Sequence, residues 1–338
     1  MMKIYTGSTV LIAILLASWS YTNKKNIAVS EDMKVTTLLQ QLGEDLEAKK
    51  PNMDLAGVSV EAGETLFKEG FAKKPRGGKS RKQSKHFVCT SCHNVVREDP
   101  DLSVSDPQAR LEYTDSKGLP FLQGTTMHGA VSRETYYNGD YDKKYGDLVK
   151  PARYDVRGAI QLCAVECAQG RSLKEWELES VLAYLWDIDI TVGDLGLSAS
   201  ELAQIEDQTV ADADKIELVK SKYLLGSPAH FTPPPVDRKA GSGLPGDTAN
   251  GKLIYDNSCL HCHYRGKYSY YHLDDSKLSF KQLSKLAGTY HRYSIYQVTR
   301  WGVPSKAGKK SYMPQYPVEK LSNQQLADLR AYIDLRAD

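Results

Sequence analysis

Two Cys-x-x-Cys-His motifs carry the most specific chemistry in this sequence, CTSCH at residues 89–93 and CLHCH at residues 259–263. In each motif, two thiols can form thioethers with the vinyl groups of one haem, and the adjacent histidine can bind its iron. A zinc site or a local disulfide would also use a Cys-x-x-Cys pair, but neither requires the histidine. The sequence therefore predicts two covalently bound haem c groups. The expected attachment sites are Cys89, Cys92, Cys259 and Cys262, and the expected iron ligands are His93 and His263.

The sixth ligand of the second haem is predicted to be Met313, the single methionine of the C-terminal half. It lies nine residues before Ser322, on a loop that would cross the open face of the haem. Methionine and histidine together favour the reduced iron and raise its potential. If Met313 instead fills space in the core, His272 or His291 would have to take its place.

The corresponding position before the first closing helix holds a cysteine. Nine residues before Ser172 is Cys163, and a thiolate ligand there would stabilise ferric iron and lower the potential of the first haem. Three alternatives remain open: Met127 or His128 as the ligand, Cys167 as the ligand, or a disulfide between Cys163 and Cys167. Residues four apart on a helix have Cα atoms about 6 Å apart, which permits a disulfide.

The same order of elements surrounds each motif. Residues 62–67 and 250–255 both contain glycine, two spacers, an aliphatic residue and an aromatic residue, which favours an amphipathic helix. Capping boxes at 172–175 and 322–325 predict a closing helix after each motif. Helix, haem loop and closing helix are typical of class I cytochrome c domains. The expected fold class is therefore all-α, with two such domains in tandem.

A partly helical, proline-containing connector is expected between the repeats. Residues 198–225 favour one or two polar helices, and 227–246 form a loop-rich linker with three consecutive prolines that keep it extended. A short helix is expected around residues 35–46. The predicted organisation is a signal peptide at 1–20, an N-terminal extension at 21–55, a first cytochrome c domain at 56–192, the connector at 193–245 and a second cytochrome c domain at 246–338.

The first residues predict export. A lysine precedes a short apolar run, and Ser18 and Ser20 follow at a spacing that suits signal peptidase. The run is short for a transmembrane helix, although an uncleaved N-terminal anchor is the alternative. We therefore expect a periplasmic protein that meets the membrane only through an uncleaved N-terminus, if at all.

Charge is uneven along the chain. The net charge of +2 identifies no partner, and no nucleic-acid module or partner is expected. Residues 68–85 carry eight basic side chains and one acidic one. This basic segment could dock an acidic redox partner or attract an anion, or it could be a solvated insertion.

Part of the sequence resembles the dihaem thiosulfate dehydrogenases and, more distantly, the sulfur-oxidising cytochrome subunit with a cysteine-ligated haem. Residues 118–121 resemble that family's Gly-Leu-Pro-Phe, and residues 160–171 resemble its segment around the axial cysteine. Cys163, Gly170 and Arg171 fall on the matching positions. The family's arginine before the cysteine has no counterpart in register, with Arg157 nearby, and its Ser-Met pair is replaced here by Cys-Ala at 167–168.

The resemblance implies an oxidoreductase that passes electrons from an anionic sulfur substrate through both haems to a redox partner protein, such as a small cytochrome or a terminal oxidase. Cys163 would be the catalytic centre. Arg157 and Arg171, with Arg133 as a further candidate, would bind the anion. The alternatives are an electron carrier or respiratory-complex subunit without a substrate, and a haem-based sensor, which no signalling domain supports.

Overall fold

The computed structural model describes residues 27–303 and 313–338. These residues confirm the all-α class, since their only β-type pairings are isolated bridges. The expected signal peptide lies outside the described residues. Among the helices that are described, none combines the length and the apolar character needed to cross a membrane.

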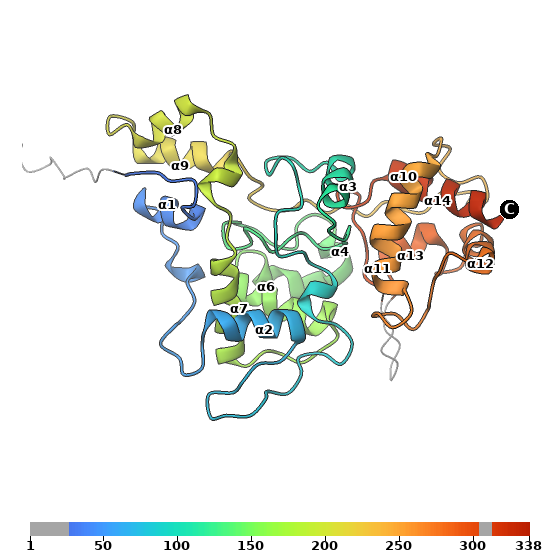
Figure 1. The fold of residues 1–338 in the computed structure, drawn as a ribbon, viewed down its shortest axis with the longest axis horizontal. Coiled ribbons are helices and arrows are strands. Elements are labelled where there is room, and N and C mark those ends of the chain that lie inside the picture. The colour runs from blue at the N-terminus through green and yellow to red at the C-terminus, as the bar shows by residue number, and fades with distance from the viewer. Residues whose placement is uncertain (1–26, 304–312) are drawn as a thin grey trace, which may run out of the picture.

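One group of helices surrounds the first motif (Figure 1). Its elements are α2 (Val60–Glu69), η2 (Cys89–Ser91), α4 (Tyr141–Tyr145), η3 (Gly146–Leu148), α5 (Val149–Ala152), α6 (Val156–Leu162), the π-helical turn η4 (Cys163–Cys167) and α7 (Glu175–Asp187). Helix α3 (Pro107–Ser116) contacts α10 (Thr248–Ile254) instead, and its Leu111 packs in the core of the second group.

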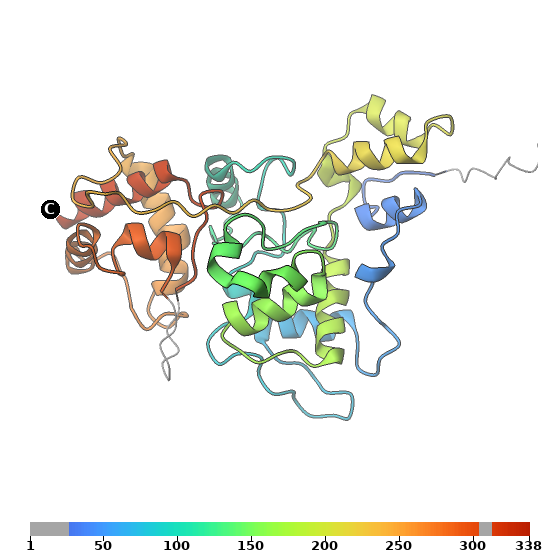
Figure 2. The ribbon, with the colours of Figure 1, turned by 180° about the vertical axis from the view of Figure 1, so that it is seen from behind.

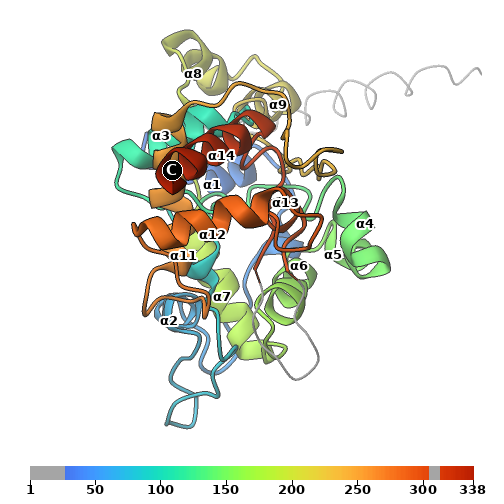
Figure 3. The same ribbon diagram turned by 90° about the vertical axis from the view of Figure 1, so that its right-hand side faces the viewer.

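A second group of helices surrounds the second motif, towards the C-terminus (Figure 1). Its elements are α10 (Thr248–Ile254), the π-helical turn η6 (Tyr255–Cys259), α11 (Leu260–His263), α12 (Lys277–Ala287), α13 (Ile295–Trp301) and α14 (Asn323–Ala337). Seen from this end of the molecule, α12 and α14 pack side by side in front of the first group (Figure 3).

Each group is built on a helix pair that crosses at a glycine. A Cβ atom on Gly63 of α2 would lie 1.8 Å from the Ser180 carbonyl oxygen of α7. A Cβ atom on Gly251 of α10 would lie 2.1 Å from the Asp328 carbonyl oxygen of α14. Both positions need glycine, because any side chain would prevent such close approach of the backbones. The two halves therefore repeat the same helix crossing.

The N-terminal extension and the connector share a third, smaller core. Helix α1 (Val35–Gln41) packs against α9 (Asp212–Lys220), and α8 (Ala199–Glu206) packs beside α9. The core of this cluster includes the fully buried side chains of Leu38, Ile205 and Val219. Figure 2 shows the three helices beside the first group. The remaining short elements here are η1 (Glu47–Lys49) and η5 (Val192–Leu195).

The two closing helices begin differently. Ser322 caps α14 as predicted, since its hydroxyl accepts the Gln325 N–H at 3.0 Å and the Gln325 side chain accepts the Ser322 N–H at 2.9 Å. The prediction that Ser172 caps the first closing helix is wrong, because α7 begins at Glu175 and its N-cap is Lys174. The Glu177 carboxylate accepts the Lys174 N–H at 2.8 Å, which fixes the later start.

The later start of α7 changes the spacing that pointed to Cys163 as an iron ligand. The contacts at the two glycine crossings align Ser180 with Asp328, and in that register Met313 corresponds to Val165. Val165 lies midway between Cys163 and Cys167. The spacing before the closing helix therefore does not distinguish the two cysteines, and only their surroundings can.

Candidate haem sites

The first motif lines a cavity of about 220 Å³. Cys89, Cys92 and His93 form part of its wall, and Cys163 and Cys167 line the same cavity from η4. Apolar side chains make up much of the remaining lining, including Leu66, Phe67, Val88, Ala130, Val156, Ile160, Leu173, Val181 and Leu185. Such a lining suits a flat and mostly apolar group such as haem.

The fold orients His93 for ligation. Its Nδ1 lies 2.7 Å from the Thr125 carbonyl oxygen, which fixes the ring and leaves Nε2 as the nitrogen available to iron. A Cβ atom on Gly124 would lie 2.5 Å from the His93 ring, so this glycine lets the ring sit against the backbone. Burial lowers the pKa of His93, which favours the neutral imidazole that binds iron.

The attachment cysteines of this motif are suited to becoming uncharged thioethers. Burial raises the pKa of Cys89 to about 12. Burial also raises the pKa of Cys92 well above its usual value, with a contribution from Cys262. A thiolate would be costly in this lining, whereas a thioether carries no charge. Together with the orientation of His93, these features fit a covalently attached haem.

Another part of the cavity wall presents two thiols on one turn of π-helix. The Ala168 N–H donates to the Cys163 carbonyl oxygen at 2.8 Å, which closes the wider turn. Both cysteines are free. The neighbouring Cys167 side chain, burial and the charges of other cysteines including Cys89 and Cys92 raise the pKa of Cys163. Cys163 and Cys167 share the cavity with the attachment cysteines.

Cys167 faces a cluster of tyrosines. Its sulfur lies 3.5 Å from the Tyr145 hydroxyl and 3.9 Å from the Tyr137 hydroxyl. The neighbouring Cys163 side chain lowers the pKa of Cys167 to about 7 against the opposing effect of burial, and the two tyrosines add to the shift. Tyr141 packs against both tyrosines, with ring centroids 5.3 Å from Tyr137 and 5.9 Å from Tyr145. No local pattern in the sequence links these tyrosines to the cysteines.

Met127 and His128, the other two candidate iron ligands of the first site, line different pockets. Met127 lines the cavity. His128 has both ring nitrogens engaged, with Nδ1 at 2.9 Å from the Ile188 carbonyl oxygen and Nε2 at 3.1 Å from Asp194 Oδ2. His128 lines an adjoining pocket instead, so it would have to give up a contact before it could bind iron.

Arg157 and Arg171, which were expected to bind an anion, do not line the cavity. Arg157 Nε lies 2.6 Å from Glu179 Oε1, and Arg171 Nη2 lies 2.6 Å from Glu177 Oε1. Both arginines also donate hydrogen bonds to backbone carbonyl groups. The structure therefore gives these arginines structural partners and does not bring them to Cys163.

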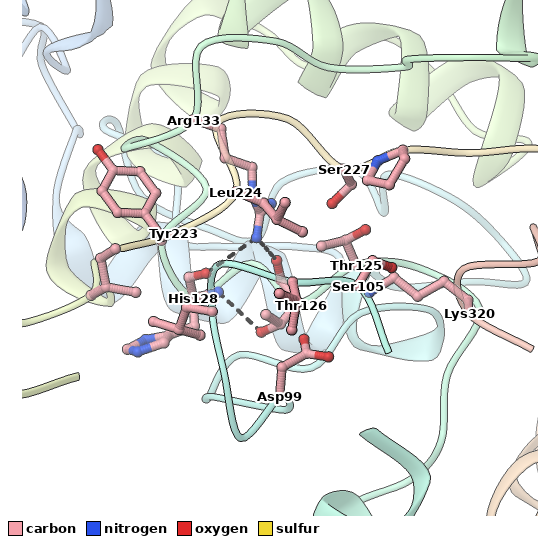
Figure 4. A pocket seen from close by; sticks show the side chains of 15 residues that line it. Asp99, Ser105, Thr125, Thr126, His128, Arg133, Tyr223, Leu224, Ser227 and Lys320 are labelled. Carbon is pink, nitrogen blue, oxygen red and sulfur yellow. Dashed lines mark hydrogen bonds between the residues drawn. The ribbon is translucent and has the colours of Figure 1, made fainter. Parts of the chain in front are cut away.

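Two other cations do line the cavity, Arg133 and Lys320. Arg133 Nη2 donates to the Thr126 and His128 carbonyl oxygens at 2.8 and 3.3 Å, and burial lowers the pKa of this arginine. Figure 4 shows Arg133 and Lys320 in a small adjoining pocket that shares both residues with the cavity at the first motif. Lys320 was missed because it belongs to the C-terminal part of the chain, and no local pattern links it to the first motif.

The second motif repeats the arrangement of the first. His263 Nδ1 lies 2.7 Å from the Tyr271 carbonyl oxygen, and burial lowers the pKa of His263. Burial raises the pKa of Cys259 to about 12 and the pKa of Cys262 to about 11. The histidine is thus fixed through one nitrogen and the thiols are kept neutral, as in the first site.

Met313 lies at the start of the segment that follows the undescribed residues 304–312. Its backbone pairs with Val303, whose N–H donates to the Met313 carbonyl oxygen at 2.9 Å. The alternative ligands His272 and His291 are both exposed. Ligation by Met313 stays a prediction.

The two sites meet at a shared boundary. Pro314 and Gln315, directly after Met313, line the cavity at the first motif. The Phe121 N–H donates to the Asn257 carbonyl oxygen at 2.9 Å, and the Tyr316 hydroxyl donates to the Phe121 carbonyl oxygen at 3.5 Å. The segments next to the second motif and to Met313 therefore contact the first half of the molecule.

Residues 248–335 match the family model for cytochrome c. The matched stretch begins with α10 and ends in α14, so it contains the second motif, Met313 and the helix pair that crosses at Gly251. This part of the protein is a c-type cytochrome domain, which binds haem and transfers electrons. No curated protein and no solved structure matches the chain.

Proposed function

We propose that the protein is an exported, periplasmic dihaem cytochrome c that oxidises an anionic sulfur compound at its first haem site. The observation that carries this proposal is the first cavity, where a Cys-x-x-Cys-His motif and the Cys163 thiol share one space with the cations Arg133 and Lys320. The helix crossing repeated at Gly63 and Gly251 supports a second haem domain in the N-terminal part.

Each haem, when bound, supplies a one-electron acceptor. His93 and Cys163 would bind the first iron, and His263 and Met313 would bind the second. A thiolate ligand lowers the potential and a methionine raises it, so these side chains favour electron flow from the first site to the second. A redox partner protein would then accept the electrons.

Arg133 and Lys320 would attract the anion to the cavity. Lys320 is buried and Arg133 is partly buried, so their charges act through a medium less polarisable than bulk water. Thiosulfate is the substrate that the resemblance suggests. Joining two thiosulfate ions through a sulfur–sulfur bond releases two electrons, one for each haem. The Cys163 sulfur would contact the substrate sulfur.

An electron carrier without a substrate is the second candidate. The observation that favours it is the ion pairing of Arg157 and Arg171 outside the cavity, which takes away the two candidate cations nearest to Cys163 in sequence. In that case the exposed basic residues of the loop after α2 would serve partner docking.

A combined measurement tests the proposal. Denaturing mass spectrometry should show two haems on the intact protein, and Cys89→Ala and Cys259→Ala should each weaken attachment at one site. Steady-state assays with thiosulfate and an artificial electron acceptor should show turnover that Cys163→Ser abolishes. Two haems without turnover would favour the carrier, and a single haem would overturn the dihaem proposal.

A further inference from the structure

Two free thiols lie on the wall of the cavity at the first motif. Cys163 and Cys167 are four residues apart, and both line this cavity. Once four of the six cysteines are used for haem attachment, these two are the remaining thiols of the chain. We propose that Cys163 and Cys167 form a dithiol–disulfide couple that acts as a two-electron redox centre beside the first haem.

The local backbone favours this pairing. Cys163 and Cys167 are the first and last residues of the π-helical turn η4, so they lie about one turn apart and both side chains leave the same face. Residues four apart on a helix have Cα atoms about 6 Å apart, which is within the range that a disulfide spans. Gln83 also holds the turn, since its Nε2 donates to the Ala164 carbonyl oxygen at 2.7 Å.

Tyrosines hold Cys167 in place for this reaction. The Tyr145 hydroxyl, 3.5 Å away, and the Tyr137 hydroxyl, 3.9 Å away, both approach the Cys167 sulfur. Hydrogen bonds from these hydroxyls would keep the sulfur next to Cys163. Tyr137 also lines the cavity, so it approaches Cys167 from the side on which the haem would bind.

The step balances without a further reactant besides the haems. With Cys163 held as a thiolate by the iron, the Cys167 S–H bond would break, the Cys163 sulfur would leave the iron and one S–S bond would form, so that one proton and two electrons leave the pair. The two electrons equal the capacity of two ferric haems, each of which accepts one. The identity of this acceptor rests on the proposed dihaem function, whereas the pairing of the two sulfurs does not.

Oxidation of the pair would also change the first iron site. A sulfur in a disulfide is no longer a thiolate, so Cys163 could not remain an anionic ligand. The reduced pair would therefore give a thiolate-ligated first haem, and the disulfide would leave that position open to another ligand.

A titration of oxidising equivalents tests the inference. The purified holoprotein is reduced fully, freed of reductant without oxygen, and titrated with ferricyanide while haem absorbance is followed. Samples are quenched in acid, unfolded and alkylated, so that mass spectrometry reports free thiols at residues 163 and 167. The wild-type protein should consume two more equivalents than Cys167→Ser, and its two thiols should lose alkylation together.

The matched variant makes the result independent of haem number. With two haems the expected totals are four equivalents for wild type and two for Cys167→Ser; with one haem they fall to three and one, and the difference stays at two. Cys167→Ala controls for the serine hydroxyl. Equal consumption by wild type and Cys167→Ser, with both wild-type thiols still alkylated after full oxidation, would overturn the proposal.

A spectroscopic readout checks the link to the iron. The low-spin thiolate signal in electron paramagnetic resonance should disappear from the wild-type protein as the disulfide forms, and it should persist in Cys167→Ser at the same degree of haem oxidation. A signal that persists in both proteins after alkylation is lost would overturn the assignment of Cys163 as a member of the pair.

Discussion

Lys320 Nζ lies 3.3 Å from Glu98 Oε1, and this contact joins the C-terminal part of the chain to the region around the first motif. Arg110 Nη2 lies 3.1 Å from the other oxygen of the same carboxylate. Glu98 and Arg110 are fully buried, and Lys320 is nearly so. One carboxylate therefore balances two buried cations at the boundary between the halves, next to the cavity at the first motif.

Glu98→Gln should be the most damaging substitution in this group. It leaves two buried cations without an anion, and breaking a buried pair in this way costs about 3–5 kcal/mol. Lys320→Met leaves Glu98 paired with Arg110 and should cost about 2 kcal/mol. Denaturant unfolding of the two variants gives the comparison. A larger loss in Lys320→Met would show that the lysine, rather than the carboxylate, holds the boundary.

Acid should weaken the ion pairs that Glu98 makes with Arg110 and Lys320. Burial alone would raise the pKa of Glu98, but Arg110 and Lys320 outweigh it and hold the pKa well below its usual range. A depressed carboxyl pKa contributes stability above the unfolded value of about 4.3, and this stability is lost as the pH falls towards the folded pKa. The stability difference between wild type and Glu98→Gln should therefore shrink below about pH 4. A constant difference down to about pH 3 would contradict this explanation.

Each glycine crossing should control one haem site. Gly63→Ala would place a Cβ atom 1.8 Å from the Ser180 carbonyl oxygen, so α2 and α7 must separate, at a cost of about 3 kcal/mol. Gly251→Ala should act in the same way on α10 and α14. Haem content and the spectrum of each site report the effect. The exposed Glu69→Ala on α2 serves as a control and should change stability by less than about 0.5 kcal/mol.

Met313→Ala should affect the second haem alone. Loss of a methionine ligand removes the preference for reduced iron, so the potential of that haem should fall and its red charge-transfer band should vanish. Redox titration followed by absorbance measures both changes. An unchanged spectrum would point to His272 or His291 as the ligand.

Substitutions of Arg133 and Arg157 should have different effects on the first site. Arg133 lines the first cavity, and a nearby positive charge favours reduced iron, so Arg133→Gln should lower the potential of the first haem by tens of millivolts. It should also raise KM for an anionic substrate. Arg157→Gln breaks the contact with Glu179 outside the cavity and should affect stability without moving the potential or KM. Equal shifts in both variants would contradict the placement of the substrate site.

The local chemistry of this protein was determined by its sequence. The Cys-x-x-Cys-His motifs, the helices that flank them and the cap at Ser322 depend on residues a few positions apart, so spacing alone predicts them. The glycines at 63 and 251 also stand in matching local patterns, and the structure shows why, since each allows a helix crossing.

Tertiary structure decided which charges reach the first cavity. Arg157 and Arg171 are near Cys163 in sequence, but Glu179 and Glu177 engage them elsewhere, whereas the distant Lys320 reaches the cavity. The start of α7 was likewise set by the contact between Glu177 and the Lys174 N–H rather than by Ser172. Long-range packing determines these contacts, because a buried charge must pair with an opposite charge that the folded backbone places nearby. Spacing along the chain does not predict which charges become neighbours.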